Sequence, residues 1–192
     1  KPIIGCEVYT ARRSRFDKDK DADSDYGHLV LLAENDTGYH NLIKLVTRSW
    51  SEGFYYKPRV DMELLREYRE GLIALSACLA GDIPRLLLNG QYEDAKKMAL
   101  DFQELYGKDR FYLELQYNGL TEQNKVNAQL IKLSQETGIP LVATNDVHYI
   151  NREDSKMHDI LMCIQTQTTV HDTDRMSFET DEFYLKSPEE MK

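Results

Sequence analysis

Cysteine is scarce in this sequence, and long hydrophobic runs are missing. The 192 residues contain three cysteines, Cys6, Cys78 and Cys163, which are scattered and odd in number. A disulfide framework needs paired cysteines, so we expect a reducing, cytoplasmic setting. No apolar run approaches the ~20 residues that span a bilayer, and no basic segment followed by an apolar one marks a secretory signal. We therefore expect no membrane partner.

Positive charge is also in deficit. Lysine and arginine number 24 against 33 aspartates and glutamates, which gives a formal net charge of −9. A general nucleic-acid-binding face needs the opposite sign, so any contact with nucleic acid should use a small local site or cations from another domain. The hydrophobic share of 41% is ordinary for a soluble protein, and the length suffices for one sizeable domain.

Common nucleotide and calcium motifs are absent. There is no G-x-G-x-x-G and no Walker A sequence, so a Rossmann or P-loop site is not indicated. The acidic run at 17–25 lacks the glycine and the distal glutamate of an EF-hand, and its low apolar content predicts a mobile loop. Neither end looks like a natural terminus: residue 1 is not Met, and the helix-start pattern Ser187-Pro188-Glu189-Glu190 is followed by only two residues. We expect a fragment of a longer protein.

What is present is an alternation of short apolar runs and segments with helical spacing. The predicted strands are 2–9, 28–33, 72–77, 111–116 and the run from Pro140. The predicted helices are 39–52, 61–68, 82–88, 92–106, 121–137 and 151–165. Such alternation is typical of parallel βαβ units, so the expected fold is α/β, as an open sheet or a barrel.

The stretch from Pro140 to Tyr149 begins as an apolar strand and ends in polar residues. Asp146 and His148 are two positions apart, so in an extended backbone their side chains leave the same face. A carboxylate and an imidazole in one space make half of a metal site. The alternative is a turn in which Asn145 and Asp146 hydrogen-bond locally and His148 lies on the surface.

Three further candidate metal ligands lie at predicted strand boundaries: Glu7, His28 and Cys78. Each also has a structural interpretation, since a lone cysteine is often a small buried hydrophobe and a lone histidine is often hydrogen-bonded within the fold. Glu7 could pair with an arginine of the following loop. His28 fits less well because it lies at the start of its run. Their occurrence together with Asp-x-His favours a shared site, because parallel strands bring such boundaries to one end of a sheet.

Six stretches of the sequence resemble a known family. The resemblance is carried, in order, by GCEVY (5–9), YGHLVLLA (26–33), GFYYKPR (53–59), LSACLAG (75–81), ATNDVHY (143–149) and FETDEFYL (178–185). These are similar to the PHP (polymerase and histidinol phosphatase) domain found at the amino-terminal end of bacterial replicative DNA polymerase III α subunits. The resemblance covers essentially the whole chain.

The resemblance implies a seven-stranded βα barrel that is incomplete here, because the family's first motifs, a His-x-His and an Asp-His pair, would lie upstream of Lys1. It implies a partial PHP domain at 1–170 and an irregular tail at 171–192 that leads toward polymerase domains. Members hold up to three divalent ions, such as Zn, Mn or Fe. The positions in this sequence that match ligand positions are Glu7, His28, Cys78, Asp146 and His148.

The resemblance also implies metal-dependent phosphoester hydrolysis, as a 3′→5′ exonuclease acting on the DNA primer end. Lys57 and Arg59 are candidates for holding substrate phosphates, although surface cations in a loop are an equal alternative. The competing function is a non-catalytic scaffold that stabilises the polymerase and docks a separate proofreading exonuclease among the other replicase subunits. A free-standing phosphatase is a third possibility. We expect His40, His158 and His171 to be structural or surface residues. The alternative for His158, on the helix after the Pro140 strand, is a place beside the metal ligands.

Overall fold

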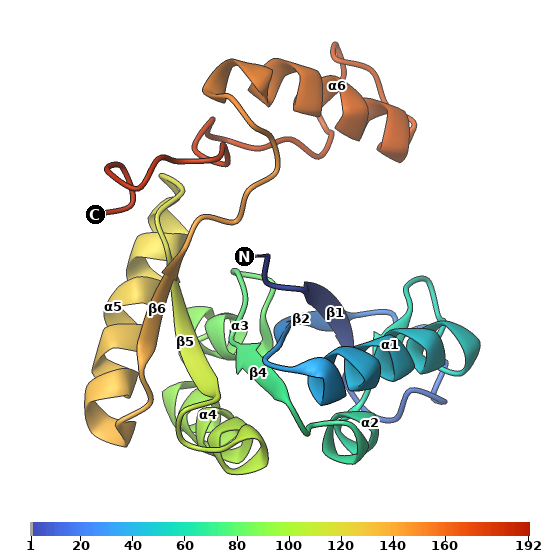
Figure 1. The fold of residues 1–192 in the computed structure, drawn as a ribbon. Helices are drawn as coiled ribbons and strands as arrows, with labels where there is room; N and C mark the ends of the chain where they lie inside the picture. The colour runs from blue at the N-terminus through green and yellow to red at the C-terminus, as the bar shows by residue number, and fades with distance from the viewer. Residues whose placement is uncertain (1) are drawn as a thin grey trace.

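The computed structural model describes residues 2–192 and shows a curved sheet with helices packed along its outside (Figure 1). The strands of this region are β1 (Gly5–Ala11), β2 (Tyr26–Ala33), β3 (Arg59–Val60), β4 (Leu72–Leu75), β5 (Phe111–Gln116) and β6 (Leu141–Thr144). The helices are α1 (Asp36–Ser51), α2 (Met62–Glu67), α3 (Asp82–Leu88), α4 (Tyr92–Tyr106), α5 (Thr121–Thr137) and α6 (Ser155–Thr166), the last preceded by the 3₁₀ turn η1 (Arg152–Asp154).

The sheet is mixed, and the expectation of purely parallel βαβ units is wrong. Its strand order is β3-β1-β2-β4-β5-β6. Strand β2 runs antiparallel to both β1 and β4, whereas the β1–β3, β4–β5 and β5–β6 pairs are parallel. The segment between β1 and β2 contains no helix, so the chain returns directly beside β1 and the two strands pair antiparallel. The α/β class is confirmed, and a closed seven-stranded barrel stays a prediction.

The strands of the sheet are paired over unequal lengths. Strands β1 and β2 share seven register pairs, and β5 and β6 share four. Strands β4 and β5 are joined by only two, Ala74 with Phe111 and Leu75 with Tyr112. Strand β6 is at the edge and is half-exposed, so the expectation of a fully buried strand there is wrong. An edge strand lacks the second neighbour that would cover it.

The two faces of the β1–β2 pair differ in burial, which decides where a site can form. Alternate side chains of a strand point to opposite faces. Val8 and Thr10 of β1 share the buried face with Leu29 and Leu31 of β2 and pack under the helices. The intervening residues, including Glu7 and His28, lie on the other face, which is half-open.

Several helix boundaries follow from local chemistry and match the predicted ones. The Asn35 side chain accepts from the Gly38 N–H at the start of α1, and the Asp61 side chain accepts from Leu64 N–H at the start of α2. Gly138 closes α5 in the left-handed region, with φ of 73°. Residues 92–106, 111–116 and 121–137 form the predicted elements with the predicted bounds.

The segment at 12–25 is joined to the body of the domain by two buried arginines, and the mobility expected for the acidic run at 17–25 stays a prediction. Arg15 is 2% exposed and bonds to Asp61 at 3.1 Å and to Glu52 at 2.7 Å. Arg59 is 0% exposed, and its guanidinium donates to backbone carbonyls of the segment at Arg15, Asp17 and Asp23. The segment has few apolar side chains that could pack against the domain. The buried arginine instead provides hydrogen-bond donors for its backbone carbonyl groups.

The C-terminal part extends away from the sheet, with α6 standing apart from the other helices in Figure 1. It has its own small cluster of buried side chains, Tyr149, Phe183 and Tyr184. In this part of the chain a single bridge joins Tyr149 and Tyr184. One side of α6 leaves large apolar side chains exposed: Met157, Ile160, Leu161 and Ile164. The proposed boundary at residue 170 stays a prediction.

Candidate metal centre

Three of the candidate ligands come together on the half-open face of the sheet. One ligand atom from each of Glu7, His28 and Cys78 lies within 4.8 Å of the other two. The Nδ1 of His28 is 2.9 Å from Oε1 of Glu7 and 3.7 Å from Sγ of Cys78. We call these three residues the triad. Carboxylate, imidazole and thiolate are together the ligand types of a Zn²⁺-like site.

Strand register places the first two members of the triad. Glu7 lies opposite Val30, and His28 is two positions before Val30 on the same face. The two side chains are therefore diagonal neighbours across an antiparallel pair. This explains how His28 reaches the triad although it lies near the start of its strand. Because β2 runs antiparallel to β1, the early residues of β2 lie beside the later half of β1.

A tight turn after β4 delivers Cys78. Ala77 adopts a φ of 63°, which is unfavourable for a residue with a side chain. The turn is closed by a hydrogen bond from Gly81 N–H to the Cys78 carbonyl at 2.8 Å. His28 N–H donates to the Ala80 carbonyl at 3.2 Å, so the turn is tied directly to β2. Strained backbone of this kind is found where the surrounding fold fixes a functional side chain.

The electrostatics of the triad suit a cation. The hydrogen bond from His28 holds the pKa of Glu7 below its usual value despite partial burial. Burial raises the pKa of the Cys78 thiol to about 12, with the carboxylates of Asp146 and Glu7 adding to the rise. Ligand atoms around a tetrahedral Zn²⁺ lie roughly 3.4–3.6 Å apart. The Cys78–His28 separation of 3.7 Å is close to this spacing, and the Glu7–His28 separation of 2.9 Å is shorter than it.

Asp146 and His148 lie next to the triad but not in the manner expected. Strand β6 ends at Thr144, and Asp146 has a φ of 48°, so the backbone is not extended and the same-face argument fails. The Nδ1 of His148 is instead 2.8 Å from the carbonyl oxygen of Asp146. Burial raises the pKa of Asp146, and the neighbouring charges of His148 and Glu7 act on it in opposite directions. Both side chains therefore share the electrostatic environment of the triad.

Glu114 of β5 is a buried carboxylate beside this site that the sequence analysis did not single out. It is 4% exposed, and its Oε1 accepts from Thr144 and, at 3.3 Å, from Gln116. Its Oε2 makes no hydrogen bond within residues 2–192. Burial raises the pKa of Glu114, and the charge of Asp146 adds to that effect. In the sequence it is a polar position of an alternating strand, which normally faces solvent.

Comparison with known proteins gives the family. The sequence model of the PHP domain matches residues 1–118, more than half of the chain. The chain belongs to the PHP domain family. All five candidate metal ligands of this PHP domain lie in the region shared with longer relatives, although Asp146 and His148 fall after the matched span.

The curated relatives include the DNA polymerase III subunit alpha of Borreliella burgdorferi and that of Treponema pallidum, each 52% identical over the full chain. The corresponding protein of Thermus aquaticus is 48% identical, again over the full chain. The chain spans about a sixth of the length of these relatives, with coverages of 17%, 16% and 16%. The similarity therefore extends over the whole of this chain but over only a small part of each relative.

The two cations suggested for phosphate binding differ sharply in environment. Arg59 of the PHP domain is fully buried and donates to four backbone carbonyls, so its guanidinium does not face the candidate metal centre as a phosphate ligand would. Lys57 is half-exposed, and its Nζ lies 5.5 Å from the centre of the Tyr9 ring. His158 lies against His148, with ring centres 5.5 Å apart, and burial lowers its pKa.

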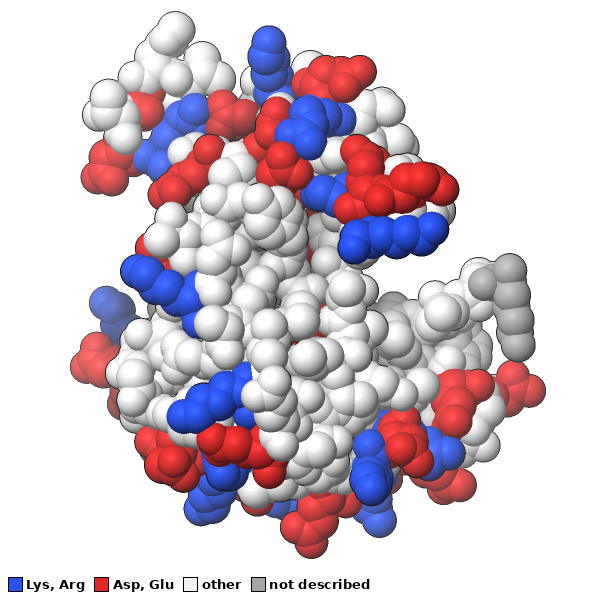
Figure 2. All heavy atoms as spheres, turned by 90° about the vertical axis from the view of Figure 1, so that its left-hand side faces the viewer, with Lys and Arg blue, Asp and Glu red and all other residues white. Residues whose placement is uncertain are grey.

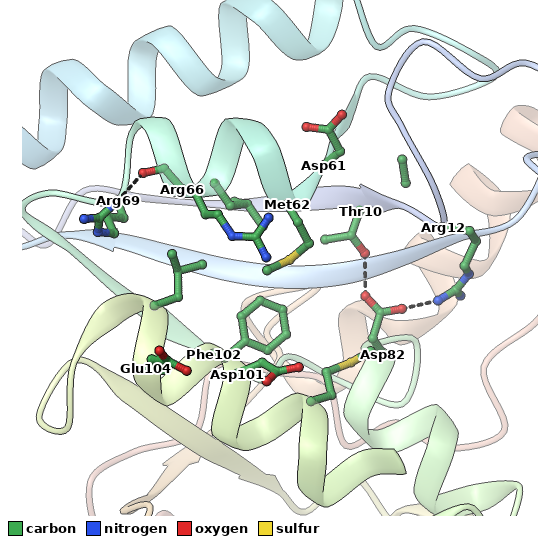
Figure 3. Close-up of a pocket in the computed structure, with 14 residues that line it drawn as sticks. Thr10, Arg12, Asp61, Met62, Arg66, Arg69, Asp82, Asp101, Phe102 and Glu104 are labelled. Atoms are coloured by element: carbon green, nitrogen blue, oxygen red, sulfur yellow. Dashed lines mark hydrogen bonds and ion pairs between the residues drawn. The ribbon is translucent and has the colours of Figure 1, made fainter.

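A large cavity lies away from the triad, between α2 and α4 (Figure 3). Its volume is about 600 Å³, and Thr10, which lines it, belongs to the opposite face of β1 from Glu7. Met62 and Phe102 supply apolar walls, while the Arg12–Asp82 ion pair stands at one end. The cavity is therefore separate from the candidate metal centre.

The charge of the PHP domain is spread over its surface. On the face shown in Figure 2, basic and acidic side chains are interspersed among uncharged ones, and no broad basic area is visible there. In the part of the chain that the structure describes, no helix has the length and apolar character needed to cross a membrane.

Proposed function

We propose that this chain is the PHP part of a bacterial replicative DNA polymerase III α subunit, acting in the cytoplasm. We further propose that it performs metal-dependent phosphoester hydrolysis, as a 3′→5′ exonuclease on the primer end of DNA. The relatives named above support the first statement. The observation that carries the second is the triad, in which three different ligand types converge within 4.8 Å.

Glu7, His28 and Cys78 would hold one ion of Zn, Mn or Fe, and Asp146 and His148 would contribute to a second position beside it. Divalent ions at such ligands lower the pKa of a coordinated water and polarise a phosphodiester. The hydrogen bond between Glu7 and His28 keeps both side chains turned into the site. Glu114 supplies a buried carboxylate whose free oxygen can accept a hydrogen bond from a group entering the site.

The test is metal content by inductively coupled plasma mass spectrometry on the polymerase that contains this domain. Wild type is compared with the double variant Asp146→Asn/His148→Ala, and His40→Ala serves as a matched control because His40 is an exposed histidine on α1. We expect more than one ion per wild-type and control chain, and a loss of at least one ion in the double variant. Absence of bound metal in folded wild type supplied with Zn, Mn and Fe would refute the proposal.

The alternative function is a scaffold that stabilises the polymerase and docks a separate proofreading exonuclease or another replicase subunit. The exposed apolar side of α6 favours this alternative. Four neighbouring side chains are exposed there, Met157, Ile160, Leu161 and Ile164, and contiguous exposed apolar side chains are typical of a protein–protein interaction site. The two functions are compatible. A primer-extension assay with a mismatched 3′ end separates them, since only the exonuclease function removes the mismatch before extension, in proportion to bound metal.

A further inference from the structure

An aromatic wall continues the candidate metal centre along the half-open face of the sheet. Tyr9 lies directly opposite His28 in the β1–β2 register, and their ring centres are 5.2 Å apart. Tyr26 is 4.8 Å from Tyr9 and is stacked parallel to His28 at 6.1 Å. All three rings are partly exposed. Flat rings next to a phosphodiester-cleaving site are suitable for stacking nucleobases.

A cation lies beside this wall. Lys57 Nζ is 5.5 Å from the centre of the Tyr9 ring, so Tyr9 lies close to both the triad member His28 and Lys57. Lys57 forms no salt bridge with any residue of the described range 2–192. Lys57 is therefore an available positive charge, and Tyr9 lies between it and the triad in the chain of contacts. At this position Lys57 can neutralise a phosphate of a bound strand.

The acidic loop is partly neutralised by arginines. Asp23 is paired with Arg13 at 2.6 Å, and Asp25 is paired with Arg12 at 2.9 Å and with Arg85 at 2.6 Å. Paired carboxylates contribute little net field at a distance. The overall charge of −9 therefore overstates the negative field of this loop.

The residue before Lys57 adds a second aromatic surface in an unusual conformation. Tyr56 has a φ of 59° and is 60% exposed. The turn that presents it is closed by a hydrogen bond from Tyr55 N–H to the Lys57 carbonyl at 3.0 Å, and the Tyr55 and Tyr56 rings pack at 4.6 Å. A bulky side chain held in the left-handed region at a turn tip is typical of a segment that contacts a ligand.

We propose that Tyr9, Tyr26, Tyr56 and Lys57 form a binding subsite for the last nucleotides of single-stranded DNA. Bases stack on the tyrosines, and Lys57 neutralises a phosphate, so that the terminal phosphodiester lies at the triad. The subsite deepens the proposed exonuclease function and rests on it. Its recognition uses ring faces and backbone charge, so it accepts any base sequence.

The test measures binding of a fluorescein-labelled oligodeoxythymidine to the polymerase that contains this domain by fluorescence anisotropy, at several salt concentrations. Lys57→Met should weaken binding about tenfold and lower the salt slope by about one, because one phosphate contact is lost. Tyr56→Ala should weaken binding at least about fivefold through loss of stacking.

Matched controls come from the same chain. Lys44 makes the same kind of contact on α1, with its Nζ 5.6 Å from the Tyr68 ring, so Lys44→Met should leave the affinity unchanged. Tyr117 is 69% exposed at the end of β5, so Tyr117→Ala controls for removal of an exposed tyrosine. Equal losses in variants and controls, unchanged affinity in both Lys57→Met and Tyr56→Ala, or preference for an oligoribonucleotide would each overturn the assignment.

Metal content of the same samples separates this inference from the proposed function. Lys57→Met and Tyr56→Ala should retain the metal of the wild type, since neither residue belongs to the triad. Wild type that binds metal while the variants bind DNA normally would overturn the subsite alone. Wild type without metal would overturn the proposed hydrolysis, whatever the DNA affinity.

Discussion

Replacing Arg59 by methionine should destabilise the domain strongly without acting through DNA. The guanidinium is fully buried and satisfies backbone carbonyls from two separate segments. Its hydrogen bonds run to Gly53 at 3.2 Å, Asp23 at 2.9 Å, Arg15 at 3.3 Å and Asp17 at 2.8 Å. Methionine fills the volume of the arginine stem but offers no donor, so these carbonyls lose their partner.

The magnitude follows from these contacts. A hydrogen bond to a charged group contributes about 1.5–3 kcal/mol, and a buried acceptor left without a partner costs about 1–3 kcal/mol. Water can reach part of the loop once it loosens, and removing the buried charge offsets some of the loss. We therefore expect a net loss of about 3 kcal/mol. For a protein of this size, 1 kcal/mol corresponds to about 2–4 °C, so Tm should fall by about 6–12 °C.

Thermal unfolding followed by circular dichroism gives the result, with Lys57→Met as the control because Lys57 is half-exposed two residues away. The control should melt within about 2 °C of the wild type. Arg59→Met that melts like the wild type yet loses DNA affinity would refute the reasoning, since Arg59 would then be a ligand for phosphate and not a support for the loop.

Two further substitutions test the surroundings of the site. Because burial raises the pKa of Glu114, its stabilising contribution is complete below the unfolded value of about 4.3 and is lost as pH rises through the folded value. Glu114→Gln should therefore raise the Tm of metal-free protein by about 2–4 °C at pH 7 and by less near pH 4.5; a uniform fall at both pH values would contradict this. Ala77→Gly should change the free energy of unfolding by less than about 0.5 kcal/mol in urea titration, since relief of the left-handed strain offsets the lost methyl group. Ala74→Gly, in the interior of β4, should cost about 1 kcal/mol or more, and equal effects of the two would argue against strain at Ala77.

The sequence was informative where function depends on residue type within a short motif. The candidates Glu7, His28 and Cys78 could be selected from ligand chemistry and resemblance, and the structure brings them together. Helix ends such as those at Asp61 and Gly138 were predictable because a cap is a local interaction.

Features set by distant parts of the chain were not predictable in this way. The antiparallel direction of β2 depends on which strands it meets, and alternation of elements alone does not encode that. Arg59 resembled an exposed loop cation because nothing nearby in sequence shows that the loop at 12–25 covers it. Glu114 was missed for the same reason, since its burial arises from packing against β6 and the turn after β4.

The narrow β4–β5 connection divides the candidate metal centre as well as the sheet. Glu7, His28 and Cys78 are attached to the strands before it, whereas Asp146 and His148 are attached to β6 beyond it. Two register pairs resist separation less than the seven of β1 and β2, so we expect the sheet to open more readily at this junction than between β1 and β2. Metal loading would then be sequential: a first ion enters the triad in an open state, and a second is retained only when the two halves of the sheet have closed. A chelator would remove the ions in the reverse order of loading. The rate at which the ion of the triad is lost would then report how often the sheet opens.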